Sequence, residues 1–368
     1  MKSKLIFNLL IIVTLFSMVI SACAPGAQVS TTATAGSPVP TFPQGTPVLN
    51  VMTHDSFAAT QDVITSFEQQ NHVQVNFIKS GDAGAALNKA ILSKNAPLAD
   101  VFYGVDNTFL SRALSAGIYE AYVSPVLANI PKQYQLDPSN QALPVDHSFV
   151  CLIYDKGYFA GKNLPVPQSF EDLLKPDYKG ALVVENPATS SPGLAFLLAT
   201  IVHFGADGYL NFWKSLKDNG LAVVNGWETA YYTNFSGSSG KGPQPLVVSY
   251  NTDPAAEVFF SPTPITESPV GSILTPQMCF QEIEFVGILK GTKQLDLAQK
   301  FVDFMLSVQF QEDLPLQMYV LPVNSQAALP DVFKKYIQDP TQPATMNPDE
   351  IAQNRDAWIK AWTDAVLK

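Results

Sequence analysis

The chain has few of the residues on which metal sites and many enzymes depend. Its 368 residues include three cysteines and four histidines. His54, His72, His147 and His203 lie far apart, without the short spacings of a metal site. No HExxH sequence, CxxC pair or G-x-S-x-G elbow occurs in the chain. We therefore expect neither a metal nor a cofactor, and we expect the chain not to be an enzyme.

Charge is also sparse, and most of it is negative. Charged residues make up 15% of the chain, and 32 acidic residues against 22 lysines and arginines give a net charge of −10. No basic stripe is present to neutralise phosphates, which argues against nucleic acid as a partner. An acidic surface instead gives a mild preference for cationic ligands.

The N-terminus carries an export signal. Two lysines precede an apolar run over residues 5–20, which is shorter than a full membrane span. Residues 1–22 are therefore predicted to be a signal peptide. The sequence Ile20-Ser21-Ala22-Cys23 resembles a bacterial lipobox, which implies that Cys23 becomes the lipidated first residue and anchors the chain to the membrane. The alternative is a transmembrane anchor that ends in cysteine by chance.

Residues 23–46 are mostly small, hydroxylated or proline, and they are poor in the large apolar side chains of a core. Such a segment buries too little surface to offset the entropy of ordering, so it predicts a flexible tether. The remaining chain, from about residue 47, is longer than one hydrophobic core usually serves. We expect it to form two lobes.

The folded part alternates strand-like and helix-like patterns, which predicts an α/β fold with parallel strands. Expected strands cover residues 48–52, 72–78, 99–105, 145–154, 180–185, 221–227 and 245–251. Expected helices cover residues 63–69, 83–93, 109–116, 169–176, 194–203, 209–217 and 297–308, and a last helix begins after Asn347.

Several motifs in this order resemble one family. HDSFAA, GVDN, PATSSPGL, NGWETAY, VVSYNTDPA and QKFVDFMLSVQFQ are similar to bacterial extracellular solute-binding proteins, and most similar to their thiamine-binding members. The resemblance implies a type II periplasmic-binding fold, in which two α/β lobes are joined by hinge strands near residues 145–154 and 278–287. The N-lobe would comprise residues 47–149 plus about 280–318, and the C-lobe about 150–279 plus 319–368.

The resemblance also implies a function. A monomer held outside the cytoplasm by its lipid anchor would deliver thiamine, a thiamine phosphate or a precursor to a membrane-embedded ABC permease with its ATPase. Thiamine is flat and cationic, so its site needs aromatic faces and an anionic partner. Trp227, Tyr250 and Asp82 match residues with these roles in the family, and Tyr319 stands in place of a family tryptophan. Asp82 has a second interpretation, as the N-cap of a helix.

Other expected ligand-binding residues are less specific. Ser190 precedes a helix whose free N–H groups could bind a hydroxyl or phosphate, although it could equally be a simple cap. His54 replaces a family tyrosine, and Asp55 and Tyr231 complete the expected set. The sequence departs from the family's aromatic cage at Gln61 and Ala256, which replace a tryptophan and a tyrosine.

The sequence leaves some alternatives open. Cys151 and Cys279 lie in apolar, strand-like runs, where they could form a disulfide or remain two buried thiols. The same fold could bind a polyamine or iron, although only Tyr231 and Tyr232 suggest an iron-binding tyrosine pair. A thiaminase-like enzyme would need Cys151 as its nucleophile, and the apolar flanks of this residue argue against an activated thiol.

Overall fold

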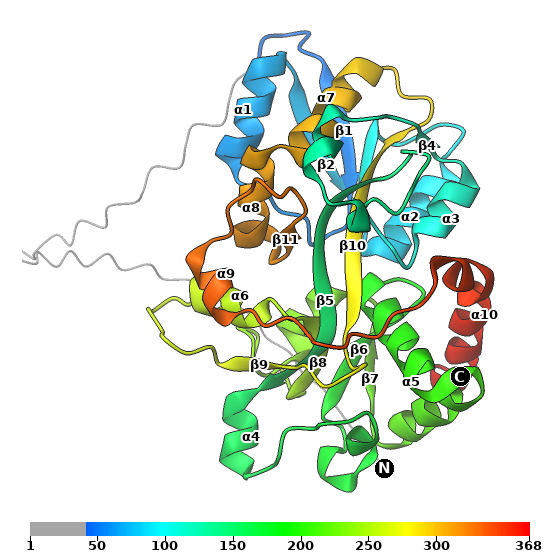
Figure 1. Cartoon of the computed structure of the whole chain (residues 1–368), viewed down its shortest axis with the longest axis vertical. Helices are drawn as coiled ribbons and strands as arrows, with labels where there is room; N and C mark the ends of the chain where they lie inside the picture. The colour runs from blue at the N-terminus through cyan, green and yellow to red at the C-terminus, as the bar shows by residue number, and fades with distance from the viewer. Residues whose placement is uncertain (1–41) are drawn as a thin grey trace, which may run out of the picture. The chain divides into compact units, whose positions relative to one another are not determined.

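Two long strands form the centre of the protein in the computed structural model, which describes residues 42–368. They are β5 (Leu143–Asp155) and β10 (Phe280–Leu289), and they run antiparallel side by side (Figure 1). A single sheet continues from them on both sides in the order β2-β1-β3-β10-β5-β8-β6-β7. The prediction of an α/β fold is therefore confirmed.

The side next to β10 is built from parallel strands. Its elements are β1 (Val48–Thr53), α1 (Gln61–Asn71), β2 (Gln74–Lys79), α2 (Ala83–Leu92), β3 (Val101–Asp106), α3 (Leu110–Ala116), β4 (Tyr119–Glu120), α7 (Leu295–Leu306) and α8 (Val308–Met318). Apolar side chains of β1, α1 and α7 share one core, which includes Leu49, Phe67 and Phe301. The expected strands and helices of this region are thus present, with small shifts of their ends.

The side next to β5 also contains parallel strands. Its elements are α4 (Lys156–Lys162), β6 (Leu182–Glu185), α5 (Ser191–Asp218), β7 (Ala222–Val224), β8 (Leu246–Tyr250), α6 (Asp253–Phe259), β9 (Val270–Ile273), β11 (Leu321–Pro322), α9 (Asp331–Tyr336) and α10 (Pro348–Val366). A short π-helix, η5 (Thr229–Asn234), lies between β7 and β8.

One helix prediction needs correction. The helix expected at residues 169–176 is instead two short 3₁₀ helices, η3 (Glu171–Leu174) and η4 (Pro176–Tyr178), because Pro176 cannot continue a helix. The two helices expected at 194–203 and 209–217 are confirmed, because α5 consists of two helical parts separated by a kink at Gly205. Gly205 has a φ of 72°, a conformation that residues with a side chain rarely adopt.

Helix α10 contacts both sides of the molecule. Its N-cap is Asn347, whose side chain accepts from the Asp349 N–H as the sequence predicted. Trp362 packs edge-on against Trp213 of α5, with ring centroids 5.4 Å apart. Arg355 lies over Phe109, beside α3. The assignment of residues 319–368 to one lobe, like the other lobe boundaries, therefore stays a prediction.

A disulfide between Cys151 and Cys279 links β5 to the residue before β10. The two sulfur atoms are 2.10 Å apart and belong to a buried cluster that also contains Trp227. The predicted signal peptide, Cys23 and most of the tether lie outside the described residues. Among residues 42–368, α5 is the one helix long and apolar enough to span a membrane, and its first three turns are buried in the core.

Candidate functional site

A small cavity lies where the two parallel-strand regions meet the long strands. Its volume is about 30 Å³. Both regions contribute to its lining, which consists of His54, Ser56, Asp82, Ser191, Trp227, Tyr250, Glu284, Met318 and Val320. The structure thus brings four of the predicted site residues together from distant parts of the chain, namely His54, Asp82, Trp227 and Tyr250.

Asp82 reaches across this site. It is the N-cap of α2 and accepts a hydrogen bond from the Ala83 N–H at 2.7 Å. Its other oxygen accepts from the backbone N–H of Trp227, on the opposite side, at 3.0 Å. Burial raises the pKa of Asp82 to about 6, although the Trp227 N–H opposes this rise. The two interpretations of Asp82 are therefore compatible, because the same carboxyl group caps a helix and lines the cavity.

Trp227 and Tyr250 supply the aromatic walls. The Trp227 ring stacks on Tyr231, with centroids 5.2 Å apart and planes 18° apart, and its indole N–H donates to Ser249 at 2.8 Å. Tyr250 lies 6.1 Å from Trp227 between ring centroids. Tyr231 lies outside the cavity lining, and its hydroxyl donates to Glu257. Tyr231 thus fixes the orientation of Trp227 rather than lining the cavity.

His54 packs closely against the backbone of β3. A Cβ on Gly104, which has a φ of 108°, would lie 2.5 Å from the His54 ring, so this strand position requires glycine. Burial lowers the pKa of His54 to about 4, so the ring is neutral at physiological pH. His54 Nε2 is 3.5 Å from Glu284 Oε1 but makes no hydrogen bond.

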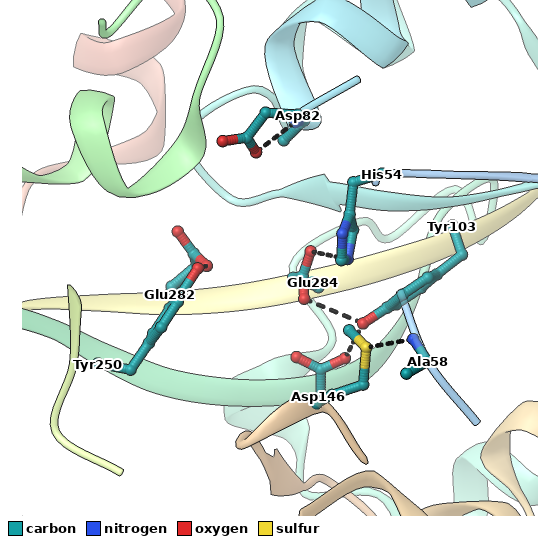
Figure 2. Close-up of polar contacts among 10 residues, drawn as sticks. His54, Ala58, Asp82, Tyr103, Asp146, Tyr250, Glu282 and Glu284 are labelled. Atoms are coloured by element: carbon teal, nitrogen blue, oxygen red, sulfur yellow. Dashed lines mark hydrogen bonds and ion pairs between the residues drawn. The ribbon is translucent and has the colours of Figure 1, made fainter. Parts of the chain in front are cut away.

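A group of buried carboxyl groups forms the floor of the site (Figure 2), and the sequence prediction missed it. Glu282 and Glu284 project from β10, and Asp146 projects from β5. Tyr250 donates to Glu282 at 2.8 Å, and the Tyr103 hydroxyl lies 2.6 Å from Asp146 and 2.9 Å from Glu284. The signal was present in the sequence, because two glutamates two positions apart in a strand share one face.

The other predicted residues lie around this cavity. Asp55 precedes the lining residue Ser56, and Ser190 precedes the lining residue Ser191. The Ser190 hydroxyl is buried and helps to lower the pKa of Asp82, against the larger effect of burial. Tyr319, which follows α8, lines a second and larger cavity of about 570 Å³.

The larger cavity has aromatic walls from Tyr232, Phe260 and Tyr319, and Ala256 also lines it. The hydroxyl groups of Tyr232 and Tyr319 are 3.3 Å apart, and Tyr232 packs edge-on against Trp227. These two tyrosines therefore lie between the larger cavity and the wall of the small one. The glycine- and serine-rich segment 237–242, which resembles a simple solvent loop in sequence, contributes Ser238 and Lys241 to the lining.

Two parallel-strand regions, joined by long antiparallel strands and lining a common cavity, define a two-lobed protein of the type II periplasmic-binding fold. Residues 96–354 match the family model of bacterial extracellular solute-binding proteins, and the chain belongs to this family. It is thus a solute-binding protein of the class that serves ABC importers, and its relatives are periplasmic or extracellular.

Two thiamine-binding proteins and one ferric binding protein are similar to this chain. The chain is 30% identical over 330 residues to a thiamine-binding periplasmic protein of Escherichia coli, a match covering 88% of this chain and 94% of the relative. A solved periplasmic thiamin binding protein is 29% identical, with a TM-score of 0.78 over 89% of this chain and 99% of its own. A ferric binding protein from Campylobacter jejuni has a TM-score of 0.69 over 86% of this chain and 99% of its own. At 22% identity, that likeness shows the fold alone.

Proposed function

We propose that this protein captures thiamine, a thiamine phosphate or a thiamine precursor outside the cytoplasm and delivers it to an ABC permease with its ATPase. One observation carries the proposal. The small cavity is lined by the aromatic rings of Trp227 and Tyr250 and by two carboxyl groups, with no lysine or arginine in its lining. Aromatic faces and carboxylates together attract a flat cation, and desolvation strengthens both contacts. Two similar proteins, at 30% and 29% identity, are named thiamine-binding periplasmic proteins.

Binding requires the two sides of the cleft to separate. Sites for molecules of this size have volumes of roughly 300–1,000 Å³, whereas the small cavity has about 30 Å³. Opening would break the hydrogen bond between Asp82 and the Trp227 N–H, and β5 and β10 would bend as the hinge. Moving Tyr232 away from Tyr319 would join the small cavity to the larger one. The ligand's positive ring would then lie near Trp227 and Asp82, with its second ring against Tyr319.

The lipid anchor is the second part of the proposal. Cys23 would carry the acyl chains, and residues 24–46 would tether the folded part to the outer surface of the membrane. Cys23→Ser should release the protein from membranes. A variant that resists carbonate washing would instead indicate an uncleaved apolar anchor.

A polyamine is the second candidate ligand. The buried carboxyl groups Glu282, Glu284 and Asp146 have no lysine or arginine ion-pair partner among residues 42–368, which suits a polycation. Iron has less support, because the Tyr231 hydroxyl is bonded to Glu257 and that of Tyr232 to Tyr319.

Calorimetric titration with thiamine, thiamine monophosphate, spermidine and ferric citrate tests these assignments. We expect thiamine or its phosphate to bind most tightly. At a hundredfold excess over its dissociation constant, it should stabilise the fold by about 2.7 kcal/mol. Small-angle scattering should show a smaller radius of gyration at saturation. A thiamine affinity no better than millimolar would overturn the assignment, and tighter binding of spermidine would establish the alternative.

A further inference from the structure

Three acidic residues lie side by side across the sheet beneath the cavity. Glu284 of β10 is directly opposite Asp106 of β3 and also directly opposite Asp146 of β5. We call Asp106, Glu284 and Asp146 the acidic row. All three are at most 6% exposed. Like charges directly opposite one another destabilise a sheet, and burial adds to that cost. A row of three ionised carboxylates at this place would therefore work against folding.

Few positive charges act on the acidic row. Lys79 acts on the neighbouring His54, and Arg355 acts on Asp106, but neither forms an ion pair with the row. The other titratable groups around Glu284 are neutral or acidic. They are His54 in the loop after β1, Asp82 at the N-cap of α2, Tyr103 of β3, Tyr250 of β8 and Glu282 of β10 itself.

Tyr103 lies between two carboxyl groups of the row. Its hydroxyl lies 2.6 Å from an Asp146 oxygen and 2.9 Å from a Glu284 oxygen. A phenol has one hydrogen, which can be directed fully at only one of two ionised carboxylates or shared weakly between both. Both contacts are strong hydrogen bonds when one carboxyl group is protonated and donates to the phenol oxygen. The geometry therefore favours a carboxylic acid at Asp146 or Glu284.

The pKa shifts of the buried carboxyl groups agree with this geometry. Burial, followed by the charge of Asp146, raises the pKa of Glu284 well above its ordinary value. Burial, followed by the charge of Asp106, does the same for the pKa of Glu282. Burial also raises the pKa of Asp146 to about 7. Each of these groups is consequently easy to protonate near neutral pH.

Two buried polar atoms remain without partners beside the cavity. Among residues 42–368, Glu282 Oε2 and His54 Nε2 have no hydrogen-bond partner, and their side chains are more than nine-tenths buried. Buried polar atoms in native proteins nearly always have a partner. Because Glu284 and His54 line the cavity, a ligand placed there would meet the acidic row and the unpaired His54 nitrogen. Glu282 lies behind the lining residue Tyr250, whose hydroxyl donates to it.

We propose that Glu282 and Glu284 determine the cleft's specificity for a positively charged ligand, because they hold protons until such a ligand binds and then release them. This inference rests on the proposed function. As the cation enters, the O–H bond of a carboxylic acid breaks, the electron pair stays on the oxygen, and the proton passes to water and then to buffer. A neutral ligand of the same shape gains nothing from this step, whereas a cation gains an ionised partner.

The direction of the pH effect follows from linkage. A bound cation favours ionised carboxylates, so the complex holds fewer protons than the free protein. Thiamine affinity should therefore rise with pH, by up to about tenfold per pH unit for each proton released. Thiamine affinity should stop rising at the pH where the carboxyl groups of the free protein are already ionised.

Thiamine titration at neutral pH, in two buffers with different heats of ionisation, counts the released protons. We expect about one proton per thiamine in the unmodified protein. Glu284→Gln and Glu282→Gln should each reduce that number and flatten the pH dependence of affinity. Glu68→Gln is the matched control, because Glu68 of α1 is buried with a raised pKa but accepts from the Val75 N–H of β2, outside the cavity lining. It should leave the proton count unchanged.

Infrared spectroscopy provides a readout that does not depend on affinity. The carbonyl band of protonated carboxylic acids should be present in the free protein at neutral pH, weaker in Glu284→Gln, and reduced by saturating thiamine. Tight thiamine binding without proton release, or a free protein without that band, would overturn this inference alone. Failure of thiamine to bind would overturn the proposed function together with it.

Discussion

Two buried polar regions of this protein differ in how completely their groups are paired. Gln311 of α8 is fully buried, and its amide N–H groups donate to the carbonyls of Val145 and Met305. Its carbonyl oxygen accepts from the N–H groups of Val323 and Asn324. In the cleft, by contrast, the buried atoms Glu282 Oε2 and His54 Nε2 have no hydrogen-bond partner among residues 42–368.

The difference separates polar groups that hold the fold from polar groups available to a ligand. A buried group that stabilises the native structure must use its hydrogen-bonding capacity within the protein. Groups that bind a ligand keep part of that capacity unused, at a cost in stability. Changes in the first kind of region should therefore lower stability, and changes in the second kind should lower affinity.

Removing the disulfide should have the largest effect on stability. The bond between Cys151 and Cys279 closes a loop with a sequence separation of 128. Loss of its restraint on the unfolded chain should cost about 4 kcal/mol in the double variant Cys151→Ala, Cys279→Ala. Urea unfolding measures this loss, and thiamine affinity of the folded variant should be unchanged. Thiol titration of the unfolded, unreduced protein should find neither cysteine free, and two reactive thiols would contradict the prediction.

Gln311→Ala should destabilise the fold by about 3 kcal/mol, because it leaves two backbone N–H groups and two carbonyls without partners inside the core. The affinity for thiamine should not change, since the side chain lies outside the cavity lining. Unfolding curves and calorimetry on the same sample test both halves of the prediction. A large loss of affinity with normal stability would contradict the division into polar groups that hold the fold and polar groups that bind a ligand.

Trp227→Ala should weaken thiamine binding at least tenfold, which corresponds to about 1.4 kcal/mol or more. The indole face lines the cavity, and Trp227→Phe should restore part of the affinity by restoring an aromatic face. Trp358→Ala in α10 is the matched control, because Trp358 is equally buried but lies away from the cavity. The control should lose stability and keep its affinity. Equal affinities for Trp227→Ala and the unmodified protein would remove Trp227 from the site.

Asp82→Asn should have the smallest effect on stability, seen mainly as a change in how stability depends on pH. The pKa of Asp82 is raised from 3.8 to about 6, so the folded protein holds this proton more tightly than the unfolded chain. Its contribution to stability is complete below pH 3.8 and is lost as the pH rises through about 6. The asparagine variant keeps an oxygen that can cap α2 but should lack this decline. Thermal unfolding across the pH range compares the two proteins, and identical profiles would contradict the prediction.

The sequence predicted the elements of the fold well where their pattern is local. The apolar run at 48–52 corresponds to β1, and the alternation at 72–78 corresponds to β2. The C-terminal helix begins at Pro348, as its cap residues predicted. Prediction failed at residues 169–176, where a single proline interrupts a helical pattern.

The site was predicted only in part. Trp227, Tyr250, Asp82 and His54 were found because short motifs around them resemble a known family, and the structure brings all four to one cavity. The carboxyl groups of the floor belong to no such motif. Glu284 was passed over because a glutamate within an apolar strand gives no indication of which residues lie opposite it.

By itself, the sequence indicated most of the long strands and helices, and its resemblance to the solute-binding family indicated two lobes joined by hinge strands. These properties follow from hydrophobic periodicity, capping residues and motifs, all of which act over a few positions. Only the tertiary structure decided that Asp106, Glu284 and Asp146 lie in one row, and that Asp82 meets Trp227. Strand register between segments more than a hundred residues apart sets these contacts. Such register depends on the packing of the whole sheet, not on any local pattern.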